Sequence, residues 1–252
     1  MMNLIRADFY RVSKNWVTYL PFVGLFLLHA IFGIGSPLIL GNVPVDASGL
    51  SYVEHLLNDV SFVFLIAIIP FVFCVSVPSF SDGTIKNDIS WGMSRTALYI
   101  SKLLVLVILS VLLYVFFIGS GLLLATIFFG FGDVLPGFWL NLLQAMGAQL
   151  FGVLAVCALM LFLSFLFKKP YVLTEILAGI LLVPMVIDLI ARLFGADLSW
   201  VLYFDLPSTI QNFGSLGLLD SRMVFIGLGV TATWFFTSLL AGITLLKKAE
   251  IK

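Results

Sequence analysis

The side chains that could take part in chemistry are few, and the clearest pair lies inside an apolar stretch. Asp188 and Arg192 are four residues apart with the acid first, the favourable orientation for an ion pair on one helix face. A charge in hydrocarbon is costly unless it is paired or hydrated, so this pair either makes the segment insertable or lines a gate or pathway. Glu175 follows Pro170 in the first turn of the same predicted helix, where a carboxylate suits the positive helix end, and it joins this candidate pathway.

Signatures of catalysis and of nucleotide binding are missing from the sequence. The dipeptide Gly-Lys never occurs, so there is no G-x-x-x-x-G-K-[ST] loop to hold phosphates. His29 and His55 are not spaced as metal ligands, and Cys74 and Cys157 lie in apolar runs, which is typical of core residues. We therefore expect no catalytic residue, no metal and no cofactor on this chain, and no nucleic-acid partner.

One short motif points to a different chemistry. Residues 130–133 read GFGD, the G-x-G-D signature of intramembrane aspartyl proteases, in which two buried aspartates share one proton. Such an enzyme needs a second aspartate within the membrane, and Asp188 is the sole candidate. Asp133, however, comes just before VLPG at the outer end of a predicted helix, where a turn is expected. The turn is the favoured interpretation, and the protease is kept as an alternative.

Composition assigns the chain to the integral membrane proteins, with residues 1–252 as a single domain. Of the 252 residues, 62% are hydrophobic and 10% are charged, and the mean hydropathy is +1.17. A spanning helix needs about 20 mainly apolar residues. Six stretches meet this requirement, which predicts an all-α fold with six transmembrane helices: residues 17–40, 60–80, 103–131, 139–167, 172–195 and 224–246.

Lysine and arginine predict the orientation of these helices, because cytoplasmic flanks of membrane proteins are enriched in both. With both termini in the cytoplasm, most of the 13 cations fall on the inner side: Arg6, Arg11, Lys14, Lys86, Arg95, Lys102, Lys168, Lys169, Lys247, Lys248 and Lys252. Only Arg192 and Arg222 lie toward the outside. We therefore expect a multi-pass plasma-membrane protein with both termini inside the cell.

Two segments outside the spans are also predicted to be helical. Residues 3–16 place Ile5, Phe9, Val12 and Trp16 at helical spacing, which is typical of an amphipathic helix in the membrane interface. The residues that define this interfacial helix are Arg6, Phe9, Arg11 and Trp16. Residues 196–223, between spans five and six, are too apolar for an ordinary loop and too interrupted for a span, so we expect short outer re-entrant helices there.

The longest polar interruption on the predicted cytoplasmic side lies between spans two and three. Residues 82–96 read DGTIKNDISWGMSRT, in which residues 84–91 can form two helical turns. Gly92 then breaks the helix, and Ser94 caps the next one. A short helix held rigidly between two spans can transmit force from a cytoplasmic partner; without such a partner it is a structured loop.

In layout, the whole chain resembles the permeases of ABC-2 type transporters. The most specific part is residues 83–102, where such permeases show a G-x-[IL]-K-N … G-x-S-R … K pattern. The resemblance implies that residues 82–96 dock on a separate ATPase subunit and that residues 3–16 form the elbow helix. It further implies a set of coupling residues: Asp82, Gly83, Thr84, Ile85, Lys86, Asn87, Gly92 and Arg95.

The resemblance also implies partners and cargo. ATP and Mg would bind to the ATPase, and two permease copies, or one copy and a homologue, would form the path, so this chain is a transport subunit and not an enzyme. In size and in its N-terminal sequence the chain is similar to bacterial permeases of lantibiotic-immunity systems and of exporters for amphipathic peptide toxins. That similarity implies export of amphipathic peptides across a bacterial plasma membrane, with a drug, a lipid-linked glycan or sodium as the alternative cargo.

Overall fold

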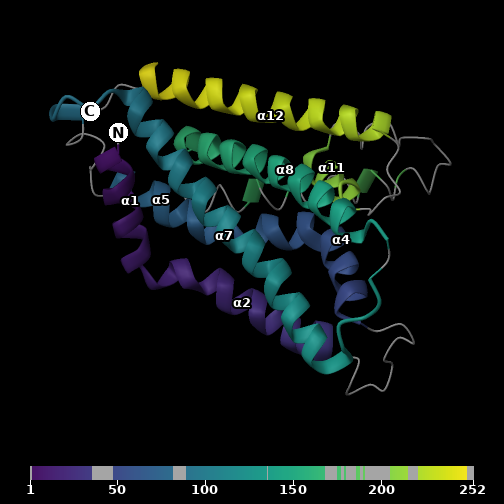
Figure 1. Cartoon of the computed structure of the whole chain (residues 1–252). Helices are drawn as coiled ribbons and strands as arrows, with labels where there is room; N and C mark the ends of the chain where they lie inside the picture. The colour runs from purple at the N-terminus through teal and green to yellow at the C-terminus, as the bar shows by residue number, and fades with distance from the viewer. Residues whose placement is uncertain are drawn as a thin grey trace.

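The computed structural model describes residues 2–35, 48–81, 89–134, 136–167, 175–176, 179, 186–187, 190, 205–214 and 221–248. Every regular element within these ranges is a helix, and none of the described residues forms a strand. The all-helical fold predicted from composition is therefore confirmed for this part of the chain. The helices pack side by side into one bundle (Figure 1).

Three helices in the described part are long and apolar enough to cross a membrane. They are α7 (Arg95–Phe129), α8 (Phe138–Phe167) and the Val224–Lys248 portion of α12 (Ser221–Lys248), and they correspond to predicted spans three, four and six. Helix α12 packs mainly on α8 and runs along one side of the bundle (Figure 1). In an apolar stretch of 18 residues, 17% of α12 is buried within the protein, against 50% in α7 and 61% in α8. Helices α7 and α8 are therefore central, and α12 is peripheral.

A fourth candidate span is broken near its middle. Helices α4 (Gly49–Ala67) and α5 (Ile69–Ser81) meet at Ile68, and the 62° bend lies within α4, between the apolar segments Gly49–Ser61 and Val63–Ser76. Pro70 lies in the first turn of α5, where its ring and missing N–H prevent α4 from continuing. The start of α4 differs from the sequence prediction, which began this span at residue 60. Ser48 and Ser51 form a capping box, so the helix begins at Gly49 instead.

The N-terminal region consists of four consecutive helical pieces. They are α1 (Met2–Lys14), η1 (Trp16–Tyr19), α2 (Leu20–Leu28) and the π-helical η2 (His29–Gly35). The apolar helix from Trp16 to Ile31 is shorter than a spanning helix requires. Residues 36–40 of the predicted first span lie outside the described residues, so that span is followed only as far as residue 35.

The π-helical turn is held in place by His29, whose side chain is fully buried. Its Nε2 lies 3.1 Å from the carbonyl oxygen of Phe117, and its Nδ1 lies 3.1 Å from the hydroxyl of Tyr52. A carbonyl oxygen only accepts, so Nε2 carries the proton and Nδ1 accepts from Tyr52. His29 therefore joins η2 to α4 and α7 as a packed, hydrogen-bonded residue.

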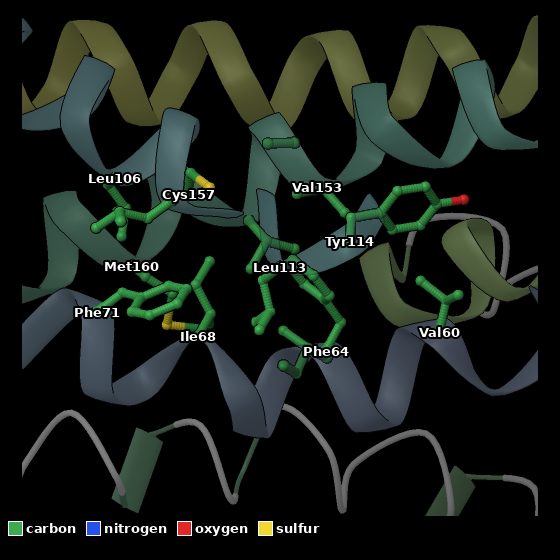
Figure 2. Close-up of a cluster of buried hydrophobic side chains, with 14 of the residues drawn as sticks. Val60, Phe64, Ile68, Phe71, Leu106, Leu113, Tyr114, Val153, Cys157 and Met160 are labelled. Carbon is green, nitrogen blue, oxygen red and sulfur yellow. The ribbon is translucent and has the colours of Figure 1, made fainter. Parts of the chain in front are cut away.

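Apolar side chains from the central helices meet in one cluster. Figure 2 shows part of it and labels these members: Val60, Phe64, Ile68, Phe71, Leu106, Leu113, Tyr114, Val153, Cys157 and Met160. The rings of Phe64 and Tyr114 are in edge-to-face contact with centroids 6.2 Å apart. Both cysteines of the chain are buried and free, as predicted. Close van der Waals packing of this kind is what holds helices together in lipid, where apolar side chains gain little from leaving the solvent.

A buried glutamine connects four helices beside this cluster. Gln149 of α8 accepts a hydrogen bond from the Tyr114 hydroxyl of α7 at 2.8 Å. Its amide nitrogen donates to the carbonyl oxygens of Leu57 in α4, at 2.6 Å, and of Ile210 in α11, at 3.2 Å. The side chain is fully buried, and both of its N–H groups and its oxygen are engaged. Gln149 therefore fixes the relative positions of these helices.

The short helix α11 (Leu206–Asn212) is the main described part of the predicted re-entrant segment 196–223. Asp205 caps it, because the Asp205 carboxylate accepts a hydrogen bond from the amide of Ser208 at 3.0 Å. Residues 206, 207, 209 and 210 are buried against the bundle. A short helix is thus confirmed within the segment, and its depth in a membrane stays a prediction.

Candidate functional site

The predicted coupling segment is described from residue 89 onward. Residues 82–88 lie outside the described part, and with them Asp82, Gly83, Thr84, Ile85, Lys86 and Asn87. The amide of Gly92 donates to the carbonyl of Ile89 at 2.9 Å, and Gly92 has a φ of +82°. Only glycine adopts this left-handed conformation without strain, so the helix break predicted at Gly92 is confirmed.

Arg95 begins α7 and has partners within the chain. Ser94 precedes it as the N-cap, with its hydroxyl accepting from the amide of Ala97 at 3.2 Å. Nη1 of Arg95 donates to the carbonyl oxygens of Leu246, at 3.1 Å, and Lys247, at 2.8 Å, in the last turn of α12. The last carbonyls of a helix have no intrahelical donor and carry partial negative charge, which suits a guanidinium group. Arg95 therefore fastens the end of α12 to the start of α7.

A lysine and an aspartate 94 positions apart form a buried pair two turns further along α7. Nζ of Lys102 lies 3.4 Å from Oδ1 of Asp8 in α1 and 3.4 Å from the carbonyl oxygen of Val75 in α5. The hydroxyl oxygen of Ser101 lies 3.4 Å from the other carboxylate oxygen of Asp8 and 2.9 Å from the carbonyl oxygen of Leu98, so its one hydrogen is shared between these acceptors. Lys102 is 2% exposed and Asp8 is 8% exposed. The pair joins α1, α5 and α7 at the end of the bundle where α12 also ends (Figure 1).

Burial makes this pair sensitive to the loss of either partner. An ion removed from water loses several kcal/mol of hydration, which a partner recovers only with good geometry and further hydrogen bonds. Here the contacts are at the long end of the hydrogen-bond range, but Val75, Ser101 and Arg11 (3.7 Å from Asp8) surround the charges. The Asp8–Lys102 ion pair holds α1 against the bundle.

One face of α1 packs on the bundle, and the placement of its apolar side chains in a membrane interface stays a prediction. Leu4, Asp8 and Val12 are buried at four-residue spacing, whereas Phe9 is 38% and Trp16 is 73% exposed. Sequence reasoning missed the role of Asp8. Its signal was present, because a carboxylate flanked by apolar residues four positions away on each side needs a cation from another element. Of the other predicted interfacial residues, Arg6 and Arg11 are both exposed, and Arg11 lies beside Asp8.

Neither a gate nor a metal site is assembled among the described residues. Glu175 is exposed, and Asp188 and Arg192 lie outside the described part, so their ion pair stays a prediction. No group of three or more His, Cys, Asp or Glu side chains that could hold a metal ion occurs within the described ranges.

The GFGD motif at residues 130–133 has a structural role in the loop after α7. The carbonyl oxygen of Gly130 accepts a hydrogen bond from the amide of Gly49 at 2.8 Å, so this loop caps the start of α4. Gly130 and Gly132 have φ values of +85° and +90°, and Asp133 is exposed. This geometry agrees with the turn interpretation of the motif.

Residues 26–251 match the model of a protein family that is described as a protein of unknown function (DUF2705). The match covers the bundle from the last turn of α2 onward, including Arg95 and Lys102, and begins after Asp8. A comparison with curated proteins found no match.

Proposed function

The chain belongs to the DUF2705 family, and we propose that it is the permease subunit of an ATP-driven exporter of the ABC-2 type. The ATPase is a separate chain that binds ATP and Mg, and two permease copies, or one copy and a homologue, form the path. Closure of the ATPase dimer presses on residues 82–96 and shifts the populations of helix arrangements, with no covalent chemistry on this chain. The cargo is an amphipathic peptide that leaves the membrane or the cytosol.

The observation that best supports this proposal is the set of contacts that the start of α7 makes with three other helices. Arg95 holds the end of α12, and Lys102 contacts both Asp8 of α1 and the Val75 carbonyl of α5. The coupling segment lies directly between α5 and α7. A displacement of this segment would therefore move α1, α5 and α12 together with α7, as a transporter requires of the element that receives the force.

The membrane topology belongs to the same proposal. Candidate spanning helices account for spans two, three, four and six, with span two as the bent pair α4–α5. Spans one and five, residues 17–40 and 172–195, are proposed from hydropathy. Both termini lie in the cytoplasm of a bacterial cell, α1 is the elbow helix in the membrane interface, and residues 196–223 re-enter from the outside.

Purification from native membranes in a gentle detergent, followed by mass spectrometry, tests the proposed function. We expect a P-loop ATPase in stoichiometric amount, and a chain that arrives alone would contradict the proposal. Lys86→Glu should reduce the recovered ATPase, whereas Lys248→Glu, at an exposed cation of α12, should not. Arg95 is unsuitable for this comparison, because its substitution also releases the end of α12.

The cargo is tested with the reconstituted complex. Amphipathic peptides should stimulate ATP hydrolysis at lower concentrations than drugs, lipid-linked glycans or sodium ions. Stimulation by one of these other cargoes alone would leave the permease assignment standing and replace the peptide.

A further inference from the structure

The outward side of α1 carries cations and no acid. Asp8 is the only acidic residue between Met2 and Lys14, and its contact with Lys102 draws it into the bundle. Arg6 and Lys14 are exposed, and the side chain of Arg11 is 43% exposed. Because the one carboxylate is buried, every exposed charge on α1 is positive.

The cations are grouped on the side of α1 that faces away from the bundle. Successive residues of an α-helix are about 100° apart around its axis, so Arg6, Tyr10 and Lys14 form one stripe. This stripe lies about 200° from the buried stripe that contains Asp8. Nζ of Lys14 is 5.7 Å from the centre of the Tyr10 ring, so the ammonium group and the aromatic face lie together.

Exposed aromatic side chains border these cations. Phe9 is 38% exposed on one flank of the stripe, and Trp16 and Tyr19, at 73% and 54% exposed, follow in η1. The apolar helix that begins at Trp16 comes directly afterwards. Trp and Tyr favour the headgroup layer of a bilayer, and the short connection keeps α1 at that depth.

We propose that the α1 surface formed by Arg6, Tyr10, Arg11 and Lys14 binds acidic lipids, with lipid phosphate groups as its ligands. A guanidinium group can hold two phosphate oxygens at once, and lysine adds a point charge. Each Lys or Arg at a membrane surface favours anionic lipid by about fivefold. A soluble acidic partner would have to displace lipid from Trp16, so the bilayer itself is the occupant that fits.

Lipid binding at this surface affects the Asp8–Lys102 ion pair between α1 and α7. Arg11 is 3.7 Å from Asp8, so its guanidinium group can serve either Asp8 or a lipid phosphate. A lipid that takes Arg11 leaves Asp8 to Lys102 and strengthens their pairing. The proposal rests on the membrane location of the chain and is independent of the transport function proposed above.

The test uses the full chain in nanodiscs that contain equal amounts of phosphatidylglycerol and phosphatidylcholine. After gentle removal of lipid, mass spectrometry measures the ratio of the two lipids that stay bound. The wild type should retain an excess of phosphatidylglycerol, and Arg6→Gln with Lys14→Gln should lower the ratio about 25-fold at low salt, since two cations are lost. The matched comparison, Lys247→Gln with Lys248→Gln, removes two exposed cations from the end of α12, where no aromatic stripe lies beside them among the described residues, and should lower the ratio clearly less.

A charge-conserving variant separates lipid binding from folding. Arg6→Lys with Lys14→Arg keeps both charges and should retain the wild-type ratio. Loss of phosphatidylglycerol in this variant would assign the effect to altered structure and overturn the proposal. Equal retention of both lipids by the wild type, or an equal loss in the α12 control, would overturn it as well. No ATPase is present in this experiment, so its outcome does not depend on the transporter proposal.

Discussion

Three buried polar side chains differ in how completely they are paired. Gln149 has all its hydrogen-bonding groups engaged, and Lys102 shares a carboxylate and a carbonyl at longer distances. The hydroxyl of Tyr99, which is fully buried in α7, has no hydrogen-bond partner among the described residues. A buried polar group left unsatisfied costs about 1–3 kcal/mol, so substitutions at these positions should differ even in sign.

Replacing Lys102 by Met should destabilise the protein by about 3–5 kcal/mol, because it leaves the buried carboxylate of Asp8 without its main partner. Denaturant unfolding of the purified protein in detergent measures this change. Arg11→Gln serves as the control, since Arg11 is exposed and lies farther from Asp8, and its effect should stay within about 0.5 kcal/mol.

The double substitution Asp8→Asn with Lys102→Met shows whether the two side chains act as a pair. It should cost clearly less than the sum of the single substitutions, because neither an uncompensated anion nor an uncompensated cation is left. Additive effects would contradict direct pairing between α1 and α7.

Among the helices, the crossing of α7 and α12 contains the unpaired hydroxyl. A Cβ atom added to Gly242 of α12 would collide with the Tyr99 hydroxyl, and the Tyr99 ring packs edge-on against Phe165 of α8 at 5.4 Å. Gly242 thus makes room for the Tyr99 hydroxyl, which forms no hydrogen bond with the described residues. Phenylalanine at position 99 would fill the same space without the cost of removing a hydroxyl from water.

Tyr99→Phe should therefore raise the free energy of unfolding by about 1 kcal/mol or more. Tyr114→Phe is the matched control in the same helix, and it should have the opposite effect, because it leaves the oxygen of Gln149 without its donor. Thermal unfolding of both variants in the same detergent checks the two signs. A loss of stability in Tyr99→Phe would mean that the hydroxyl is bound by a partner such as a buried water.

Hydropathy located the long helices, with α8 beginning one residue from its predicted start, but it began the spans within α4 and α7 too late. Span three was placed from residue 103, whereas the helix that contains it begins at Arg95, after the cap that local residue chemistry predicted at Ser94. The charge of Lys102 lowers the local hydropathy, but Asp8, 94 positions away, allows it to be buried. In α4 the charges are on one face of the helix, where Glu54 and Asp59 are exposed, while Leu57 is fully buried on the other face. A hydropathy average over neighbouring residues contains neither the distant partner of a charge nor the face on which it lies.

In the candidate site, too, features that depend on neighbouring residues could be predicted, whereas contacts between distant residues could not. The helix break at Gly92 and the cap at Ser94 follow from local residue chemistry, and both are confirmed. The partners of Arg95 and Lys102 could not be predicted, because each contact joins elements that are distant in sequence. The arrangement of α1, α5 and α12 around the start of α7 is therefore a property of the packed bundle.

For the whole molecule, the distribution of cations predicts which ends of the bundle face the cell interior. The start of α7, the end of α12 and the buried face of α1 lie at one end of the bundle, since Arg95 of α7 contacts α12 and Lys102 of α7 contacts α1. Gly130 and Asp133, beyond the far end of α7, lie at the other end. The predicted orientation places the first group in the cytoplasm and the Asp133 loop outside.

Cysteine labelling in intact cells tests this orientation. In Asp133→Cys, the exposed loop position should react with a membrane-impermeant maleimide from outside, whereas Lys248→Cys should react only after the membrane is permeabilised. The native Cys74 and Cys157 are buried, so the unsubstituted protein provides the background. Labelling of both positions from the same side would contradict the predicted span five at residues 172–195, because only α8 and α12 would then cross the membrane between the two positions. Labelling of Lys248→Cys alone from outside would keep the crossings, reverse the orientation and remove residues 82–96 from the compartment that contains ATP.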